Sequence, residues 1–250
     1  VTGATQSLPG ITCNSFSGTA DDDVWYSFVA TAASHTITVV GSASFDAVVD
    51  LRAGTCPGTN VDCADATTGG GTEVINATGL VAGSTYFVRV YHYSSLDPGT
   101  PTFTICVTTP TPANDECTDA TPLTVYGASC GATTTGEVAG ATQSISAAPC
   151  AGTANDDVWY SFVATSASHD ITVTGSASFD AVIDLRSGSC NGTNISCLDA
   201  SGSGGTETLS ATGLTIGTTY YVRVYHYYSS IPSTTTFTIL ICNFIDFNTK

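Results

Sequence analysis

Apolar and polar residues alternate with a period of two along most of the chain. In one such run, Val24, Tyr26 and Phe28 fall on the same face, and polar residues lie between them. The pattern returns at residues 45–51, 86–90 and 103–105. Alternation of this kind is typical of strands with one buried face, and no stretch shows the period of an amphipathic helix. The pattern therefore predicts an all-β protein.

The chain contains two copies of one sequence. Residues 22–56 and 156–190 align at a constant offset of 134 positions and are identical at all but six of their 35 positions. The match continues as far as Phe103 and Phe237. Seven or eight predicted strands in each copy, with no helix to cover a single sheet, predict two sheets packed face to face. We therefore expect two tandem β-sandwiches.

The alignment also sets the expected boundaries. We place the first sandwich at residues 1–109, a Pro- and Thr-rich linker at 110–114, the second sandwich at 115–242 and an apolar tail at 243–250. The second copy opens with a segment of roughly 23 residues that has no counterpart before Val1, enough for one or two strands. We expect the first sandwich to lack its N-terminal strands and the tail to be a candidate strand donor to a neighbouring copy. The interpretation that we favour over strand donation is that the chain is a window on a longer protein.

The charge of the chain excludes some classes of partner, and its cysteine content indicates a cellular compartment. The chain has 21 acidic and 5 basic residues, for a formal net charge of −16. This balance argues against binding to nucleic acid or to anionic lipid, which both need Lys and Arg. No apolar run approaches the roughly 20 residues of a membrane-spanning helix. The ten cysteines lack the spacing of zinc ligands and bracket short polar loops, which indicates disulfides and an oxidising, extracellular compartment.

Cysteine positions suggest a set of disulfides. The expected pairs are Cys56–Cys63, Cys190–Cys197, Cys130–Cys150 and Cys117–Cys242. Cys13 and Cys106 are then left without a partner. Three outcomes stay open for these two thiols, because they can pair with each other, stay reduced or bond to another chain.

Several motifs resemble a known family. They are Asp-Val-Trp-Tyr-Ser-Phe, Phe-Asp-Ala-Val-Val-Asp-Leu-Arg-Ala-Gly-Thr-Cys, Gly-Ser-Thr-Tyr-Phe-Val-Arg-Val-Tyr and Phe-Thr-Ile. The chain is similar to the bacterial pre-peptidase C-terminal domain, in the cysteine-containing version found in tandem in surface proteins of Bacteroidota, many of them carried by type IX secretion. The resemblance covers nearly the whole chain. It implies two tandem jelly-roll-like antiparallel β-sandwiches, stapled by disulfides, at the bacterial cell surface. Relatives serve as adhesive, accessory or carbohydrate- and collagen-binding modules, and some bind calcium.

Acidic residues recur at the same places in both copies and are candidate calcium ligands. They are Asp22, Asp23, Asp46, Asp50, Asp156, Asp157, Asp180 and Asp184, with Asp65, Glu73 and their copies nearby in the sequence. Calcium takes six to eight oxygen ligands, which loops rich in carboxylates can supply. The alternative is that each acid caps a turn or pairs with an arginine, and no EF-hand-like motif is present. We expect no other cofactor.

Aromatic residues near one strand end are candidates for a ligand platform. Tyr91, Tyr93, Tyr225 and Tyr227 offer an apolar face to a sugar ring or to a proline of a matrix protein, and a hydroxyl for hydrogen bonding. The alternative is that they lie half-buried at an edge of the sandwich. The histidines form two repeat pairs, His35/His169 and His92/His226, with no nucleophile motif nearby, so we do not expect an enzyme.

These observations favour a non-catalytic structural or adhesive repeat of a secreted bacterial surface protein. Near-identical repeats are typical of spacers, which need sameness rather than distinct sites. We expect neighbouring copies to be partners, by strand complementation, and assembly to run head to tail into a stalk or filament. The alternative is a carbohydrate- or matrix-binding accessory module of a secreted enzyme.

Overall fold

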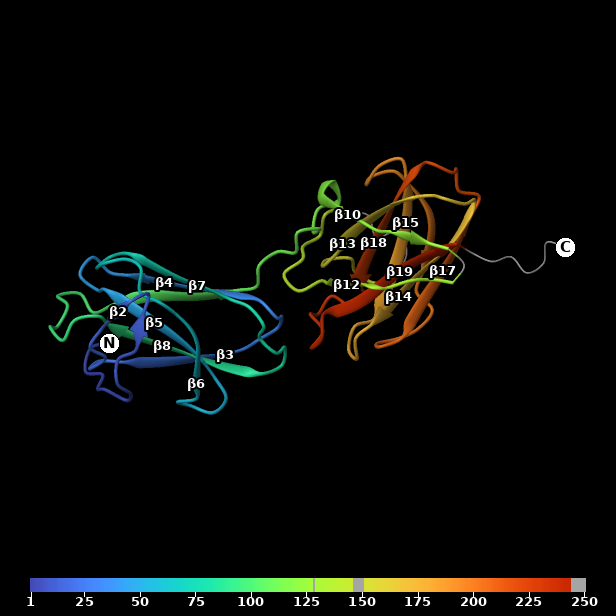
Figure 1. Ribbon diagram of the computed structural model, residues 1–250. Coiled ribbons are helices and arrows are strands. Elements are labelled where there is room, and N and C mark those ends of the chain that lie inside the picture. Colours follow the sequence, from blue (N-terminus) through green and yellow to red (C-terminus); the bar gives the residue numbers. More distant parts are fainter. Residues whose placement is uncertain (128, 146–150, 244–250) are drawn as a thin grey trace. The chain divides into compact units, whose positions relative to one another are not determined.

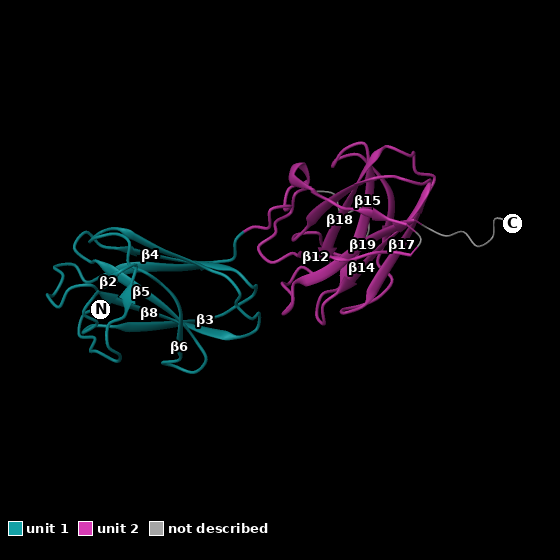
Figure 2. Ribbon diagram, in the orientation of Figure 1, with its two compact units in different colours: residues 1–110 teal, residues 111–250 magenta. Residues whose placement is uncertain are grey.

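Strands account for nearly all the regular structure, which confirms the predicted all-β class. The computed structural model describes residues 1–127, 129–145 and 151–243, and it divides into two units, residues 1–110 and 111–250 (Figures 1 and 2). Each unit is a pair of β-sheets packed on a core of its own. Within the part of the chain that is described, no helix is long and apolar enough to cross a membrane.

Unit 1 contains two antiparallel sheets and a short hairpin. Its main strands are β3 (Val24–Val29), β4 (His35–Gly41), β5 (Ala47–Ala53), β6 (Thr59–Ala64), β7 (Thr72–Ala77), β8 (Thr85–His92) and β9 (Phe103–Thr108). One sheet has the order β3-β8-β5-β6 and the other has the order β7-β4-β9. The hairpin of β1 (Thr12–Cys13) and β2 (Phe16–Ser17) precedes them.

Unit 2 repeats this plan and adds three strands. The repeated strands are β13 (Val158–Val163), β14 (Ser168–Gly175), β15 (Ala181–Ser187), β16 (Thr193–Leu198), β17 (Thr206–Thr212), β18 (Thr219–His226) and β19 (Thr236–Asn243). The added elements are the short helix η1 (Cys117–Asp119) and the strands β10 (Thr121–Pro122), β11 (Val125–Tyr126) and β12 (Thr134–Glu137). Strand β10 pairs with β13 and β11 pairs with β19, both in parallel, while β12 pairs with β19 in the antiparallel sense. Asn114, placed in the linker by the sequence, belongs to unit 2 because it hydrogen-bonds with Trp159.

Alternation places the core between the two sheets of each unit. In unit 1 the buried set includes Ile37 and Val39 of β4 and Val49 and Leu51 of β5. Unit 2 buries the equivalent residues and several more. Full burial of one such side chain is worth about 1.5–3 kcal/mol, so this face of each sheet dominates the stability of its unit.

The two units differ most along one side of the sandwich. In unit 2 the added strands cover β13 and β19, and Tyr160 on β13 is only 2% exposed. Residues 1–110 contain no counterpart of β10, β11 or β12, so β3 and β9 are edge strands. The equivalent of Tyr160 in unit 1, Tyr26, is 43% exposed. Nearly identical strands therefore have different surroundings in the two units.

The disulfides differ from the predicted pairs. The bonds are Cys13–Cys63, Cys117–Cys190 and Cys130–Cys242. Cys197 is also disulfide-bonded, and the predicted partner of Cys130, Cys150, lies outside the described residues. Cys56 and Cys106 are free and exposed. The predicted pairs Cys56–Cys63, Cys190–Cys197, Cys130–Cys150 and Cys117–Cys242 are wrong, as is the prediction that Cys13 has no partner in the chain.

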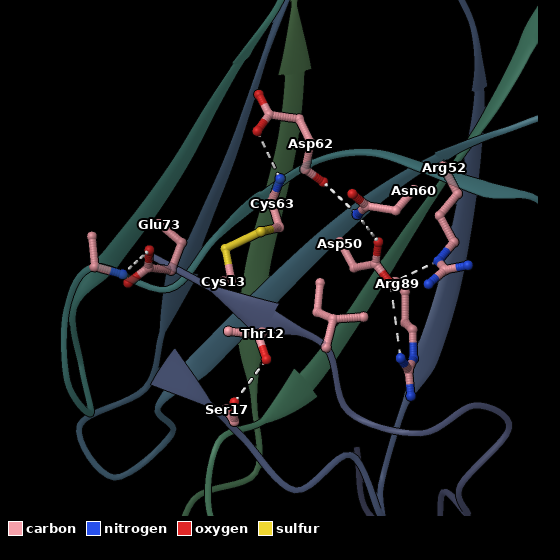
Figure 3. Close-up of a disulfide and its surroundings, with 12 residues drawn as sticks. Thr12, Cys13, Ser17, Asp50, Arg52, Asn60, Asp62, Cys63, Glu73 and Arg89 are labelled. Carbon is pink, nitrogen blue, oxygen red and sulfur yellow. Dashed lines mark hydrogen bonds and ion pairs between the residues drawn. A yellow bond between two sulfur atoms is a disulfide. The ribbon is translucent and has the colours of Figure 1, made fainter. Parts of the chain in front are cut away.

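Cys56 and Cys63 were predicted to pair because they are close in the sequence, but the structure separates them. Cys56 lies in the turn between β5 and β6, whereas Cys63 lies well along β6, opposite Asp50. Cys63 lies four residues after Thr59, where β6 begins, which is about 13 Å along the strand, whereas Cα atoms of a disulfide lie within roughly 7 Å of each other. Cys190 and Cys197 occupy the equivalent positions in unit 2. Cys63 instead bonds to Cys13, which ties the β1–β2 hairpin to the sheet (Figure 3).

Buried charges hold the N-terminal segment of unit 1 on the outer face of a sheet. The guanidinium of Arg89 is fully buried, donates to Asp23 at 2.7 Å and lies 3.8 Å from the carboxylate of Asp50. It also donates to the carbonyl oxygens of Leu8 and Pro9. Asp50 in turn accepts from Arg52 and Asn60, each at 2.7 Å (Figure 3). The network satisfies the charges that the fold removes from water, as burial of ions requires.

Unit 2 repeats this network with the equivalent residues. Arg223 donates from Nε to Asp157 at 2.9 Å and lies 4.0 Å from Asp184, which also accepts from Arg186 at 2.9 Å. Together with the pairs of unit 1, these contacts engage all four arginines of the chain in ion pairs with aspartates. Aspartates of the same unit therefore neutralise the positive charge of each arginine.

We predict that removal of one buried partner destabilises its unit strongly. Arg223→Met leaves the carboxylate of Asp157 buried without its main counter-charge, which typically costs about 3–5 kcal/mol. Urea unfolding in a Trp25→Phe background, with fluorescence from Trp159, measures this loss for unit 2. The double variant Arg223→Met/Asp157→Asn restores part of the stability. A double variant as unstable as the single one would show that the ion pair is not the cause.

We also predict that the exposed edges exchange their amide hydrogens faster than their covered copies. Outward-facing amides of β3 and β9 have no strand beside them, whereas those of β13 and β19 do. An amide without a partner exchanges directly with water, whereas a hydrogen-bonded amide exchanges only after local opening. Hydrogen exchange followed by mass spectrometry should give rates at least tenfold higher for β3 and β9. Equal protection in the two units would contradict the assignment of open edges.

Candidate functional site

The four histidines have structural roles. Nε2 of His35 accepts from the N–H of Thr31 at 3.0 Å, and Nδ1 of His92 accepts from the N–H of Asp46 at 3.0 Å. Their copies His169 and His226 repeat both contacts. Burial lowers the pKa of His169 and of His226, so the rings are neutral acceptors for backbone groups. These rings therefore fix turns of the backbone.

The predicted calcium ligands have separate roles. Asp23 and Asp50 are partners of Arg89, and Asp157 and Asp184 are partners of Arg223. Asp22 and Asp156 accept from the backbone N–H groups of His92 and His226 at 2.9 and 3.0 Å. Within the described ranges, no group of three or more His, Cys, Asp or Glu side chains is placed to hold a metal ion. These six acids thus pair with arginine or accept from the backbone, whereas Asp46 and Asp180, also predicted as ligands, each keep one buried oxygen without a hydrogen-bond partner.

Two of the predicted platform tyrosines are buried. Tyr91 and Tyr225 are fully buried, and the guanidinium carbons of Arg89 and Arg223 lie 4.8 and 5.1 Å from their ring centroids. Their hydroxyls bond to the backbone N–H of Ile11 and the carbonyl of Ala151. The prediction of Tyr91 and Tyr225 as a ligand platform is therefore wrong. The reason is that a preceding segment covers the outer face of the sheet, where alternation alone leaves them exposed.

The third tyrosine lies at a hollow on the surface of unit 1. Tyr93 is half-buried and lines a hollow of about 220 Å³. The other side chains around it are Phe16, Asp46, Asp65, Thr67 and Thr68. A larger hollow of about 430 Å³ lies beside Val1, but no aromatic side chain lines it. The smaller hollow thus combines apolar ring faces with carboxylates and hydroxyls, as sites for small polar ligands do.

Two carboxylate oxygens at this hollow have no hydrogen-bond partner. They are Oδ1 of Asp46 and Oδ2 of Asp65, and Asp65 is only 5% exposed. The neighbouring carboxylate of Glu73, by contrast, accepts from the N–H and the hydroxyl of Thr67 at 2.7 and 2.6 Å. Burial, and then the charges of Asp46 and Glu73, raises the pKa of Asp65 to about 6. A buried acceptor without a partner is costly when it is charged, which agrees with the raised pKa of Asp65.

A three-residue insertion distinguishes this hollow from the equivalent region of unit 2. The β1–β2 hairpin turns through Asn14 and Ser15, both with positive φ, as a tight two-residue hairpin turn requires. The turn presents Phe16, which is 53% exposed. The aligned sequence of unit 2 is three residues shorter and has no counterpart of Phe16. Sequence analysis passed over Phe16, although the difference in length was the visible signal.

In unit 2 the equivalent of Tyr93 is Tyr227, which is half-buried and packs edge to face on Tyr228 with 4.9 Å between ring centroids. Tyr228 is 52% exposed. Asp180, the equivalent of Asp46, also keeps a buried oxygen without a partner. Unit 2 therefore shares the tyrosine and the aspartate of the hollow but not the second aromatic wall.

Comparison with known proteins identifies a family. A model described as galactose-binding domain-like, associated with type IX secretion (T9SS), matches residues 1–105 and 113–239. No curated relative matches the chain.

One similar solved structure is the pre-peptidase C-terminal domain of a collagenase from Bacillus anthracis, with 18% sequence identity and a TM-score of 0.31. The match covers 49% of this chain and 93% of the collagenase domain. A fucolectin from Morone saxatilis, the striped bass, is 12% identical, covers 93% and 86% of the two chains, and has a TM-score of 0.22. Family membership and the disulfides together indicate an extracellular module. The chain belongs to the galactose-binding domain-like family associated with type IX secretion, with one family domain in each unit.

Proposed function

We propose that the chain is a non-catalytic adhesive module of a bacterial surface protein, and that the hollow of unit 1 is its contact with carbohydrate. The observation that carries this proposal is that the residues Asp46 and Asp65 line one hollow together with the aromatic residues Phe16 and Tyr93. Sugar rings stack on aromatic faces, and their hydroxyls donate to carboxylates. The disulfide Cys13–Cys63 holds the hairpin that carries Phe16 in place.

The charge distribution supports a neutral ligand or a basic matrix protein. The chain has a net charge of −16, and its arginines are paired with aspartates inside the units. The remaining acids give the surface a negative field, which repels nucleic acid and acidic polymers. A neutral polysaccharide meets no such barrier. Adhesion rather than catalysis fits the structural use of the histidines described above.

A second candidate function uses the same hollow. As an accessory module of a secreted enzyme, the chain would bind the polysaccharide on which a neighbouring catalytic domain acts. The neighbouring domains of the parent protein distinguish the two functions. An array of further sandwiches would indicate a stalk or filament with this adhesive contact, whereas an adjoining hydrolase would indicate an accessory module. The sequence 244–250, expected to donate a strand to a neighbouring copy, lies outside the described residues.

We predict that carbohydrate binding depends on unit 1 alone. On a glycan array, Tyr93→Ala should weaken binding about five- to tenfold, because one stacked ring contributes about 1 kcal/mol. Phe16→Ala should have a similar effect. The matched control is Tyr227→Ala, which changes the equivalent tyrosine of unit 2 and should leave binding unchanged. Equal loss in Tyr93→Ala and Tyr227→Ala, or no binding of any glycan by the wild type, would refute the proposed contact.

We also predict a pH dependence of stability that originates at Asp65. Its pKa is raised to about 6 in the folded protein from an ordinary value of 3.8. The folded state therefore holds this proton more tightly than the unfolded chain, which favours folding below about pH 4 and is lost as the pH rises through 6. Relative to wild type, Asp65→Asn should raise Tm by about 2–4 °C more at pH 8 than at pH 4. Parallel pH profiles of the two proteins, measured by calorimetry, would disprove the raised pKa.

A further inference from the structure

We infer that the hollow of unit 1 binds an amino sugar whose amino group is free and protonated. Asp46 and Asp65 attract the positive charge of this group, and Phe16 and Tyr93 contact the sugar ring. The inference rests on the carbohydrate contact proposed above, because it names the class of sugar that the same hollow takes. It starts from acidic residues that no arginine neutralises within the described part of the chain.

Three acidic side chains gather beside the hollow. Asp46 directly precedes β5, Asp65 directly follows β6 and Glu73 lies on β7. Burial raises the pKa of Asp46 and of Asp65, and the charge of Glu73 raises both further, so the three carboxyls are close neighbours. The backbone N–H groups of Ala66 and Thr67 donate to Glu73 at 2.8 and 2.7 Å, which stabilises its charge without cancelling it. The fold therefore concentrates negative charge at this place.

The arginines and the nearby histidine leave this charge in place. The two arginines of unit 1, Arg52 and Arg89, pair with other aspartates. The ring of His92 accepts from the backbone N–H of Asp46 through Nδ1 at 3.0 Å, as a neutral imidazole does. None of the described residues that line the hollow is basic. A ligand that brings its own positive charge therefore meets a favourable potential here.

The aromatic residues decide which kind of cation fits. Phe16 is 53% exposed and Tyr93 is half-buried, and both line the hollow. Ring faces attract an ammonium group and also stack on the apolar face of a sugar. An amino sugar presents both features on one ring, whereas a lysine side chain has the charge and no flat face. The volume of about 220 Å³ is below that of sites for drug-sized molecules, so the hollow takes a single sugar residue of a chain.

The hairpin that carries Phe16 is fixed beside the acidic residues. Cys13 on β1 bonds to Cys63 on β6, two residues before Asp65 (Figure 3). Asp65 is only 5% exposed, so its charge acts in a place with little water. Electrostatic attraction is stronger there than at a fully exposed carboxylate.

Unit 2 retains the acids and differs in the hairpin. Asp199 is the equivalent of Asp65, and its neighbour Glu207 accepts from the N–H and the hydroxyl of Ser201, each at 2.6 Å. Asp199 is half-buried, and the aligned sequence has no counterpart of Phe16. Unit 2 therefore provides an equivalent acid in a different setting, which serves as a matched control.

The experiment compares the binding of two oligosaccharides of equal length to the full chain. One is an oligomer of glucosamine, and the other carries an acetyl group on every nitrogen, which removes the charge and keeps the sugar rings. At about pH 6.5 most amino groups of the first oligomer are protonated, and most Asp65 carboxyls are ionised. Calorimetry should give about tenfold tighter binding of the glucosamine oligomer, and added salt should reduce this preference.

Two variants locate the charge that causes the preference. Asp65→Asn removes one negative charge and keeps the size of the side chain, so the affinities for the two oligomers should come within about twofold of each other. Asp199→Asn is the matched control in unit 2 and should keep the full preference. At about pH 5.5, binding of the glucosamine oligomer to the wild type should also release protons, because the ammonium group displaces the proton of Asp65. Proton release is measured as a dependence of the binding heat on the buffer, and Asp65→Asn should abolish it.

Equal affinities of the wild type for the two oligomers would overturn the inference and leave the carbohydrate contact of the proposed function intact. The same loss of preference in Asp199→Asn as in Asp65→Asn would overturn it too, because the charge would then act outside the hollow. If neither oligomer binds, the inference and the proposed function both fail. A lysine-rich peptide that displaces the glucosamine oligomer and binds more tightly would assign the hollow to a protein partner and overturn the inference.

Discussion

Every strand of a sandwich must have its backbone groups paired or exposed to water, and this constraint explains most of what differs between the two units. In unit 2, β10, β11 and β12 pair with the outer strands, and the disulfides Cys117–Cys190 and Cys130–Cys242 fasten that cover at two points. In unit 1 the equivalent outer strands have no strand beside them, and Cys56, the equivalent of Cys190, is free.

A second constraint acts on the outer face of the larger sheet. Arg89 and Asp50 alternate with core residues along β8 and β5, so they point away from the core and require another cover. The segment that begins near Ser7 provides it, because its backbone carbonyls accept from Arg89 while Asp23 neutralises the charge. The same segment continues into the hairpin that presents Phe16. The buried ion pair therefore positions the wall of the hollow as well as the sheet beneath it.

The alternating pattern and the internal repeat were enough to predict the class and the two sandwiches, and the motifs that resemble a known family predicted the family. They failed where the answer depended on which segment covers a face. Tyr91 and Asp50 lie on a face that alternation marks as solvent-exposed, and only the folded chain shows the segment above it. The disulfides failed for a related reason, since Cys63 bonds to a residue 50 positions away rather than to its neighbour in the sequence. Of the candidate site, Tyr93, Asp46 and Asp65 stood out in the sequence, whereas Phe16 did not.

Near-identity of the repeats argued for two equivalent spacers, and the structure weakens that argument. The identical block builds the strands of both sandwiches, but its surroundings come from segments that the repeats do not share. Three inserted residues at Asn14–Phe16 give unit 1 a hollow with two aromatic walls, and the segment before Val138 gives unit 2 its closed side. Tyr26 and Tyr160 show the consequence, since the same residue in the same strand is 43% exposed in one unit and 2% in the other. The short segments outside the shared block therefore decide which side chains surround the same strand in each unit.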